Sequence, residues 1–159
     1  MHESTQAAVR DGIARTLAAV GLGGVALIHL VDLPGKFQET PYLAWMYIGL
    51  IVASVATAAA LVRDGDRRAW AAALALPVAT IAGFVLSRTT GLPAASGDIG
   101  NWSEPLGIAS LFVEGAVAAL AGAILARLPA GSPVRSLTPQ WSLAGTPPAS
   151  TKTSTERSG

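Results

Sequence analysis

The chain has no cysteine among its 159 residues. It can therefore form neither a disulfide nor a thiolate metal site, and it has no cysteine nucleophile. Histidine is almost as scarce, since only His2 and His29 are present and His2 lies in the N-terminal segment. A bis-histidine haem or a multi-histidine metal centre is therefore not expected within one chain.

Charge is also sparse. Charged residues make up 13% of the sequence, whereas 51% of the residues are hydrophobic. The 11 basic and 10 acidic residues leave a net charge of +1, and no basic stretch is interleaved with aromatic residues. Such a chain lacks the positive field that binds nucleic acid, so we expect the lipid bilayer as its surroundings and no nucleic-acid partner.

Sequence motifs of the common enzyme classes are missing. The chain contains no GxSxG, HExxH, P-loop, GxGxxG or DxDxDG pattern, which would indicate a hydrolase, a zinc protease, a nucleotide-binding protein or an EF-hand. Thr80, Ser87 and Ser110 offer hydroxyl groups within apolar stretches, but no triad is recognisable around them. The sequence therefore predicts no cofactor, leaves a metal ion open, and makes an enzyme the least favoured class of function.

Four long stretches are almost free of charge. Each is close to the roughly 20 residues that cross a hydrocarbon core about 30 Å thick. The sequence predicts an all-α, polytopic membrane protein with four transmembrane helices in an antiparallel bundle, at residues 13–32, 42–62, 69–88 and 105–128. The first helix should end near Asp32, because a residue before proline avoids the α region and Leu33 precedes Pro34.

The two ends of the chain lie outside these helices. Residues 1–12 are expected to form a cytoplasmic N-terminal segment. Residues 129–159 are rich in Pro, Ser, Thr and Gly and lack hydrophobic periodicity. We expect them to form a disordered cytoplasmic tail.

Basic residues near the helix ends predict the orientation, because cytoplasmic loops retain Lys and Arg during insertion. Two basic residues, Lys36 and Arg88, would lie on one side of the membrane. Seven would lie on the other side: Arg10, Arg15, Arg63, Arg67, Arg68, Arg127 and Arg135. We therefore expect a multi-pass protein of the bacterial cytoplasmic (inner) membrane, with both termini inside and the loops at 32–41 and 88–104 outside.

Ionisable side chains within a membrane span are costly and usually mark function. His29 and Glu114 are such residues, and Glu114 lies roughly 13 Å along the helix that starts at Pro105, close to the midplane. Asp32 shares a helix face with His29, and Arg88 can reach inward from the end of the third helix. These residues predict an outward-facing polar pocket of His29, Asp32, Arg88 and Glu114 that binds a small ligand, ion or proton. We expect His29, Glu114 and Arg88 to share one hydrogen-bonded network there.

The outer loops add further polar candidates. They are Glu39, Asp98, Asn101, Trp102 and Glu104. For Asp98 and Glu104, as for Asp32, the favoured interpretation is structural. These residues would solvate a loop or cap a helix, with Asn101 or Ser103 at the start of the fourth helix. Glu114 also has a structural interpretation, as a contact of Arg88 or His29.

Small residues recur at helical spacing in the second and third helices. Such stripes let helices approach closely in a membrane. They are Gly49, Ala53 and Thr57, and Thr80, Gly83 and Ser87. They support the second class of function, a structural or assembly subunit of a larger membrane complex, with a homo-oligomer or another membrane protein as the partner.

Three segments carry a resemblance to known sequences. They are His29 to Pro34 (HLVDLP), Ser87 to Pro93 (SRTTGLP) and Asp98 to Gly107 (DIGNWSEPLG), followed by Glu114. They resemble segments of uncharacterised small four-helix bacterial integral membrane proteins, over about residues 13–128. The resemblance implies the four-helix architecture and supports the choice of polar residues, but it implies no activity.

Overall fold

The computed structural model describes residues 2–129, with side chains from residue 5 onward. The expected disordered tail therefore lies outside the described residues, apart from Pro129. The described part is all-α. Its elements are α1 (His2–Glu39), α2 (Pro41–Arg63), α3 (Arg67–Thr89), the short 3-10 helix η1 (Ser96–Asp98) and α4 (Pro105–Leu125). By length and composition, all four α-helices can cross a membrane.

The first helix is longer than the sequence predicts. The expectation that it ends near Asp32 is wrong, because α1 continues through Pro34 to Glu39. Proline removes one helical hydrogen bond, to the carbonyl of Leu30, and Leu30 is exposed. The next turn gains an ion pair between Lys36 and Glu39, with 3.0 Å between Nζ and Oε2.

The chain reverses at a different proline. The backbone N–H of Thr40 still bonds to the carbonyl of Lys36 at 2.8 Å, and Pro41 then begins α2. Proline is favoured at the start of a helix because its missing N–H would have no partner there. The segment 32–41, expected as an outer loop, is therefore helical except for Thr40.

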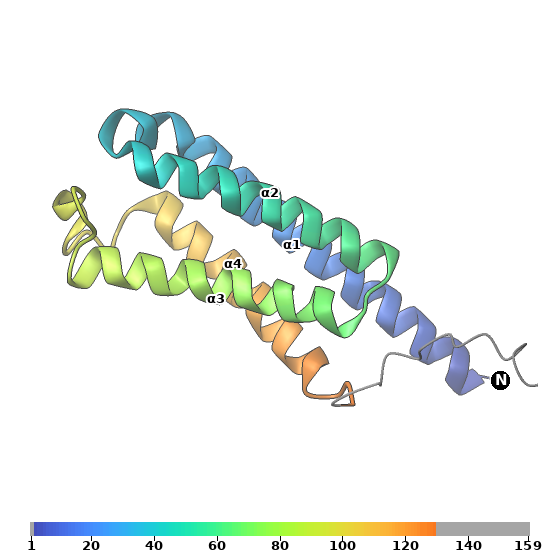
Figure 1. Ribbon diagram of the computed structural model, residues 1–159. Coiled ribbons are helices and arrows are strands. Elements are labelled where there is room, and N and C mark those ends of the chain that lie inside the picture. Colours follow the sequence, from blue (N-terminus) through green and yellow to red (C-terminus); the bar gives the residue numbers. More distant parts are fainter. Residues whose placement is uncertain (1, 130–159) are drawn as a thin grey trace, which may run out of the picture. The chain divides into compact units, whose positions relative to one another are not determined.

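The helices pack as two pairs. α1 lies along α2, α3 lies along α4, and contacts between α1 and α4 join the pairs (Figure 1). We call the end of α2 and α3 at residues 64–66 the turn end, and the end at residues 90–104 the loop end. α2 and α3 are close at the turn end and separate toward the loop end (Figure 1).

The turn end is tightly packed. A core of small and large apolar side chains fills it, comprising Ala14, Ala18, Leu22, Leu61, Ala69, Trp70, Ala73, Val117 and Ala121. The Asp66 carboxylate caps α3 by accepting from the Ala69 N–H at 2.8 Å. Arg15 donates to the Asp64 carbonyl at 3.1 Å, and Gly65 has a φ of 57°, which suits glycine.

Glycines bring α1 and α4 close together. A Cβ atom on Gly21 would overlap the Val117 side chain, and one on Gly24 would lie 3.3 Å from Val113. A methyl group on Gly23, by contrast, would meet nothing within 4 Å. The close approach of the two helices therefore follows the face of α1 that carries Gly21 and Gly24. The sequence alone did not predict this contact, although Gly21, Gly23 and Gly24 lie close together in it.

Candidate functional site

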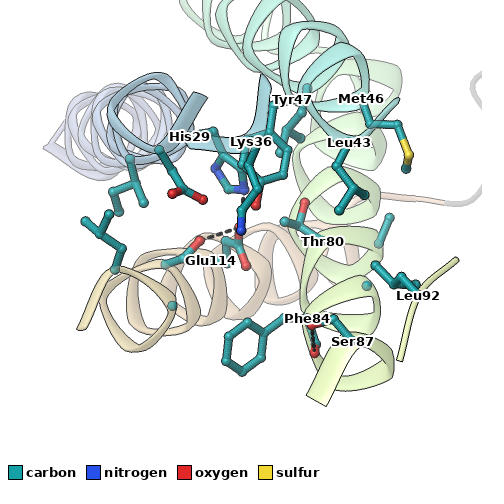
Figure 2. Close-up of a pocket in the computed structure, with 18 of the residues that line it drawn as sticks. His29, Lys36, Leu43, Met46, Tyr47, Thr80, Phe84, Ser87, Leu92 and Glu114 are labelled. Atoms are coloured by element: carbon teal, nitrogen blue, oxygen red, sulfur yellow. Dashed lines mark hydrogen bonds and ion pairs between the residues drawn. The ribbon is translucent and has the colours of Figure 1, made fainter. Parts of the chain in front are cut away.

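The loop end of the bundle encloses a cavity of about 350 Å³. Figure 2 shows His29 and Glu114 on neighbouring helices of the cavity wall, with Tyr47, Thr80 and Phe84 around them. All four α-helices and the loop between α3 and α4 contribute side chains. Much of the wall is apolar and is formed by residues such as Leu43, Met46, Leu50, Leu76 and Leu106.

One face of α1 supplies polar groups to the cavity. His29, Asp32 and Lys36 have the spacing that aligns side chains along a helix, and all three line the cavity. Lys36 belongs to this face only because α1 continues past Pro34. The Tyr47 side chain of α2 lies near Asp32, and its ring meets the His29 ring edge to face at 4.7 Å between centroids.

The imidazole of His29 is oriented by the backbone. Nδ1 lies 2.9 Å from the Val25 carbonyl oxygen, which can only accept a hydrogen bond. Nδ1 therefore carries a proton and donates it, so the neutral ring has its lone pair on Nε2. Nε2 lies 4.0 Å from Oε1 of Glu114, too far for a direct hydrogen bond.

Glu114 is almost completely buried, with 1% of its surface exposed. The hydroxyl of Ser110, one turn earlier in α4, donates to Oε1 at 2.8 Å. Its other oxygen, Oε2, is buried and has no hydrogen-bond partner within the described residues. A buried carboxylate in this state needs a proton, a donor or a counter-charge.

Arg88 does not serve as that counter-charge. Its guanidinium forms ion pairs with Asp98, at 2.9 Å, and with Glu104. It also lies over the ring of Phe84, 4.8 Å from the centroid. The prediction that Arg88 joins His29 and Glu114 is therefore wrong, because two loop carboxylates pair with the guanidinium first.

These ion pairs hold the loop over the cavity. The backbone N–H of Gly100 donates to the Arg88 carbonyl at 2.9 Å, so the loop is bound to both the main chain and the side chain of Arg88. The Tyr42 hydroxyl of α2 also donates to the Pro93 carbonyl of the loop at 2.7 Å. The loop between α3 and α4 is thus connected to α2 and α3 at separate points.

The predicted pocket residues come together in the structure. All four, His29, Asp32, Arg88 and Glu114, line the same cavity. Of the loop candidates, Asp98 and Glu104 also line it, whereas Glu39 lies outside and pairs with Lys36. The remaining two, Asn101 and Trp102, are exposed, and Trp102 contacts the ring of Phe84. Neither Asn101 nor Ser103 caps α4, which starts after Glu104 without a side-chain cap.

The small-residue stripes face the cavity for most of their length. Gly49, Ala53, Thr80, Gly83 and Ser87 all line it. A methyl group on Gly49 or Gly83 would meet nothing within 4 Å. These glycines therefore leave space between α2 and α3 and do not mark a close contact between the helices.

Three further residues complete the polar wall. In the sequence, Lys36 indicates only the orientation of the chain and Ser110 only a hydroxyl group within an apolar stretch, and Tyr47 is not a predicted site residue. The spacing of Lys36 from Asp32, and of Ser110 from Glu114, is four residues in each case, which places each pair on one helix face. That spacing was the available signal for Lys36 and Ser110, whereas nothing in the sequence distinguished Tyr47.

Within the described residues, no three side chains of His, Cys, Asp or Glu are grouped so that they could hold a metal ion. Two hydroxyl groups of the cavity wall are held by hydrogen bonds, since Ser110 donates to the Glu114 carboxylate and Ser87 donates to the Phe84 carbonyl.

Comparison with known proteins gives no further guidance. Neither protein-family models, nor curated proteins, nor solved structures match this chain.

Proposed function

We propose that this chain is an integral protein of the bacterial cytoplasmic membrane that binds a small organic ligand in the cavity at its loop end. The observation that carries the proposal is the buried carboxyl group of Glu114, which lines the cavity and whose Oε2 has no hydrogen-bond partner within the described residues. Burial of an unpaired carboxylate is unfavourable by several kcal/mol. A ligand that donates to the Glu114 carboxylate would reduce that penalty.

The size of the cavity favours a small molecule over a bare ion or a proton. Its volume of about 350 Å³ lies within the range of roughly 300–1,000 Å³ typical of sites for small organic ligands. A water molecule takes up only about 30 Å³ in the liquid. A single ion or proton at Glu114 would leave most of the space unfilled.

The proposed orientation keeps both termini in the cytoplasm and the cavity near the outer surface. Four arginines lie near the turn end of the bundle. They are Arg15, Arg63, Arg67 and Arg68. The two basic residues at the loop end, Lys36 and Arg88, are both paired with carboxylates. This asymmetry supports a cytoplasmic turn end.

An assembly subunit is the second candidate. Its main sequence support was the stripes of small residues as a partner surface, and most of those residues line the cavity. Native mass spectrometry of protein purified in detergent separates the two candidates. We expect a low-mass ligand on the wild type and on Phe112→Leu, which alters an exposed residue of α4, and its loss in Glu114→Gln. A stoichiometric protein partner without any small ligand would contradict ligand binding and favour the assembly role.

A further inference from the structure

The cavity wall carries more acidic than basic side chains. The lining residues include four carboxylates, Asp32, Asp98, Glu104 and Glu114, but only two basic side chains, Lys36 and Arg88. Both basic groups are already in ion pairs, Lys36 with Glu39 and Arg88 with the two loop carboxylates. The wall therefore has an excess of negative charge, which favours a cationic ligand and disfavours an anionic one.

The deepest polar atoms of the wall are arranged for a hydrogen-bond donor. Glu114 presents carboxylate oxygens, and the neutral His29 ring presents the lone pair of Nε2. Nε2 and Oε1 are 4.0 Å apart, so a nitrogen about 2.8 Å from both would see them at an angle of about 90°. A tetrahedral ammonium group can direct one N–H bond at each of these two atoms with little distortion.

Apolar residues surround the remaining space. α2 contributes Leu43, Met46 and Leu50, and α3 contributes Leu76 and Ala79. Met46 and Ala79 are also exposed on the outside of the bundle, so the apolar part of the wall reaches its lateral surface. A ligand body that fills this part must itself be apolar.

We propose that the ligand is a primary ammonium on a compact apolar body, bound with its nitrogen between Glu114 and His29. This assignment rests on the proposed ligand-binding function and specifies its chemistry. The N–H donors compensate the buried carboxylate, and the hydrocarbon body occupies the space between α2 and α3. A water molecule could bridge His29 and Glu114 but would leave the apolar part of the cavity empty.

Matched adamantane derivatives test the assignment. 1-Adamantylamine, 1-adamantanol and trimethyl(1-adamantyl)ammonium share one rigid body and differ in charge and N–H donors. Binding to the purified wild-type protein would be measured by calorimetry and by thermal shift. We expect the amine to bind at least about tenfold more tightly than the alcohol, because hydrogen bonds to a charged group are the stronger ones. The trimethylated cation should bind more weakly than the amine, because it has no N–H to donate.

Variants localise the effect. Glu114→Gln should remove the preference for the amine over the alcohol, whereas Phe112→Leu should keep it, because Phe112 is 79% exposed and does not line the cavity. If Glu114→Gln does not fold, the comparison of the three compounds on the wild-type protein still tests the ammonium assignment. Equal affinity for amine and alcohol would overturn the ammonium assignment and leave the ligand-binding function standing. The absence of binding by all three compounds, together with the absence of any co-purified ligand, would overturn both.

The same ammonium group occurs in free amines and in the headgroup of phosphatidylethanolamine. Nanodiscs of phosphatidylcholine, with and without added phosphatidylethanolamine, distinguish these sources. An equal affinity for the amine in the two kinds of nanodisc supports a free amine as the ligand. The negative cavity wall also favours a free amine, because the lipid headgroup carries a phosphate. Competition by phosphatidylethanolamine would instead identify the lipid as the source of the ammonium.

Discussion

At the scale of single residues, the pairing of charges decides which group remains available. Lys36 and Arg88 are mostly buried, yet each has an acidic partner within ion-pair distance. Glu114 is buried more deeply and has only a hydroxyl and a distant imidazole beside it. An unpaired buried charge is more costly than a paired one. We therefore expect the free-energy cost of burying Glu114 to depend strongly on what occupies the cavity.

A double-mutant cycle tests whether His29 and Glu114 interact. Changing His29→Ala together with Glu114→Gln should cost less stability than the sum of the two single changes, by about 0.5 kcal/mol or more, because the shared contact is lost only once. The free energy of unfolding in detergent is the measurement. Leu61→Ala with Glu114→Gln is the control, because Leu61 belongs to the core at the turn end. Strict additivity of the first pair would mean that the two side chains do not act together.

At the scale of elements, one arginine connects α3 to the loop that covers the cavity. Only 5% of the Arg88 side chain is exposed, and its two ion pairs and its contact with Phe84 use both the charge and the planar shape of the guanidinium. Lysine keeps the charge but not the forked donors or the flat surface. The loop between α3 and α4 should therefore respond to a change at Arg88 before the helices do.

Hydrogen exchange can measure this response. We expect Arg88→Lys to increase amide exchange in residues 96–104 by at least several-fold while α1 and α2 keep their protection, because local opening follows the loss of local contacts. Arg63→Lys serves as the control, since the Arg63 side chain is 82% exposed. Unchanged protection of residues 96–104 in Arg88→Lys would show that the Tyr42 and Gly100 bonds hold the loop without the ion pairs.

The contact between α1 and α4 depends on single glycines. Gly21→Ala should lower the free energy of unfolding by about 1–3 kcal/mol, because the new methyl group overlaps Val117. Gly23→Ala, two residues further along the same helix, should be neutral or stabilise by up to about 1 kcal/mol, because its methyl group meets nothing and alanine favours the helix. Thermal unfolding of the two variants compares them directly. Equal effects would mean that α1 and α4 are not in close contact at Gly21.

At the scale of the whole described chain, the two ends of the bundle have different roles. The turn end is filled by the apolar core around Trp70 and Leu61, while the loop end contains the cavity and most of the ion pairs. A packed end can keep the helices in place while the open end accepts a ligand. The proposed orientation places the open end outside the cell.

Cysteine labelling tests this orientation, and the absence of native cysteine leaves no background. Single cysteines at Gln38 and Ser96, both exposed at the loop end, should react with a membrane-impermeant maleimide on intact cells. A cysteine at Asp64 in the turn should react only after the cells are opened. Asp64 is preferable to Gly65, where a side chain would meet both a φ of 57° and Arg15. Labelling at Asp64 alone on intact cells would reverse the orientation.

The sequence by itself determined the number of helices and their approximate limits, because a span requires only enough consecutive apolar residues to match the hydrocarbon thickness. It also identified His29, Asp32, Arg88 and Glu114, which line one cavity, because ionisable residues are conspicuous among apolar ones. Both properties can be read locally along the chain.

Only the tertiary structure decided where α1 ends, which carboxylates pair with Arg88, and whether the glycines of α2 and α3 mark a contact or a space. Pro34 is tolerated within α1 and Pro41 begins α2, although both are prolines next to a predicted span. Gly21 is in close contact with a neighbouring helix and Gly83 borders open space, although both are glycines within apolar helices. The outcome at each position depends on the side chains that other helices bring near it, and that proximity is a property of the packed bundle.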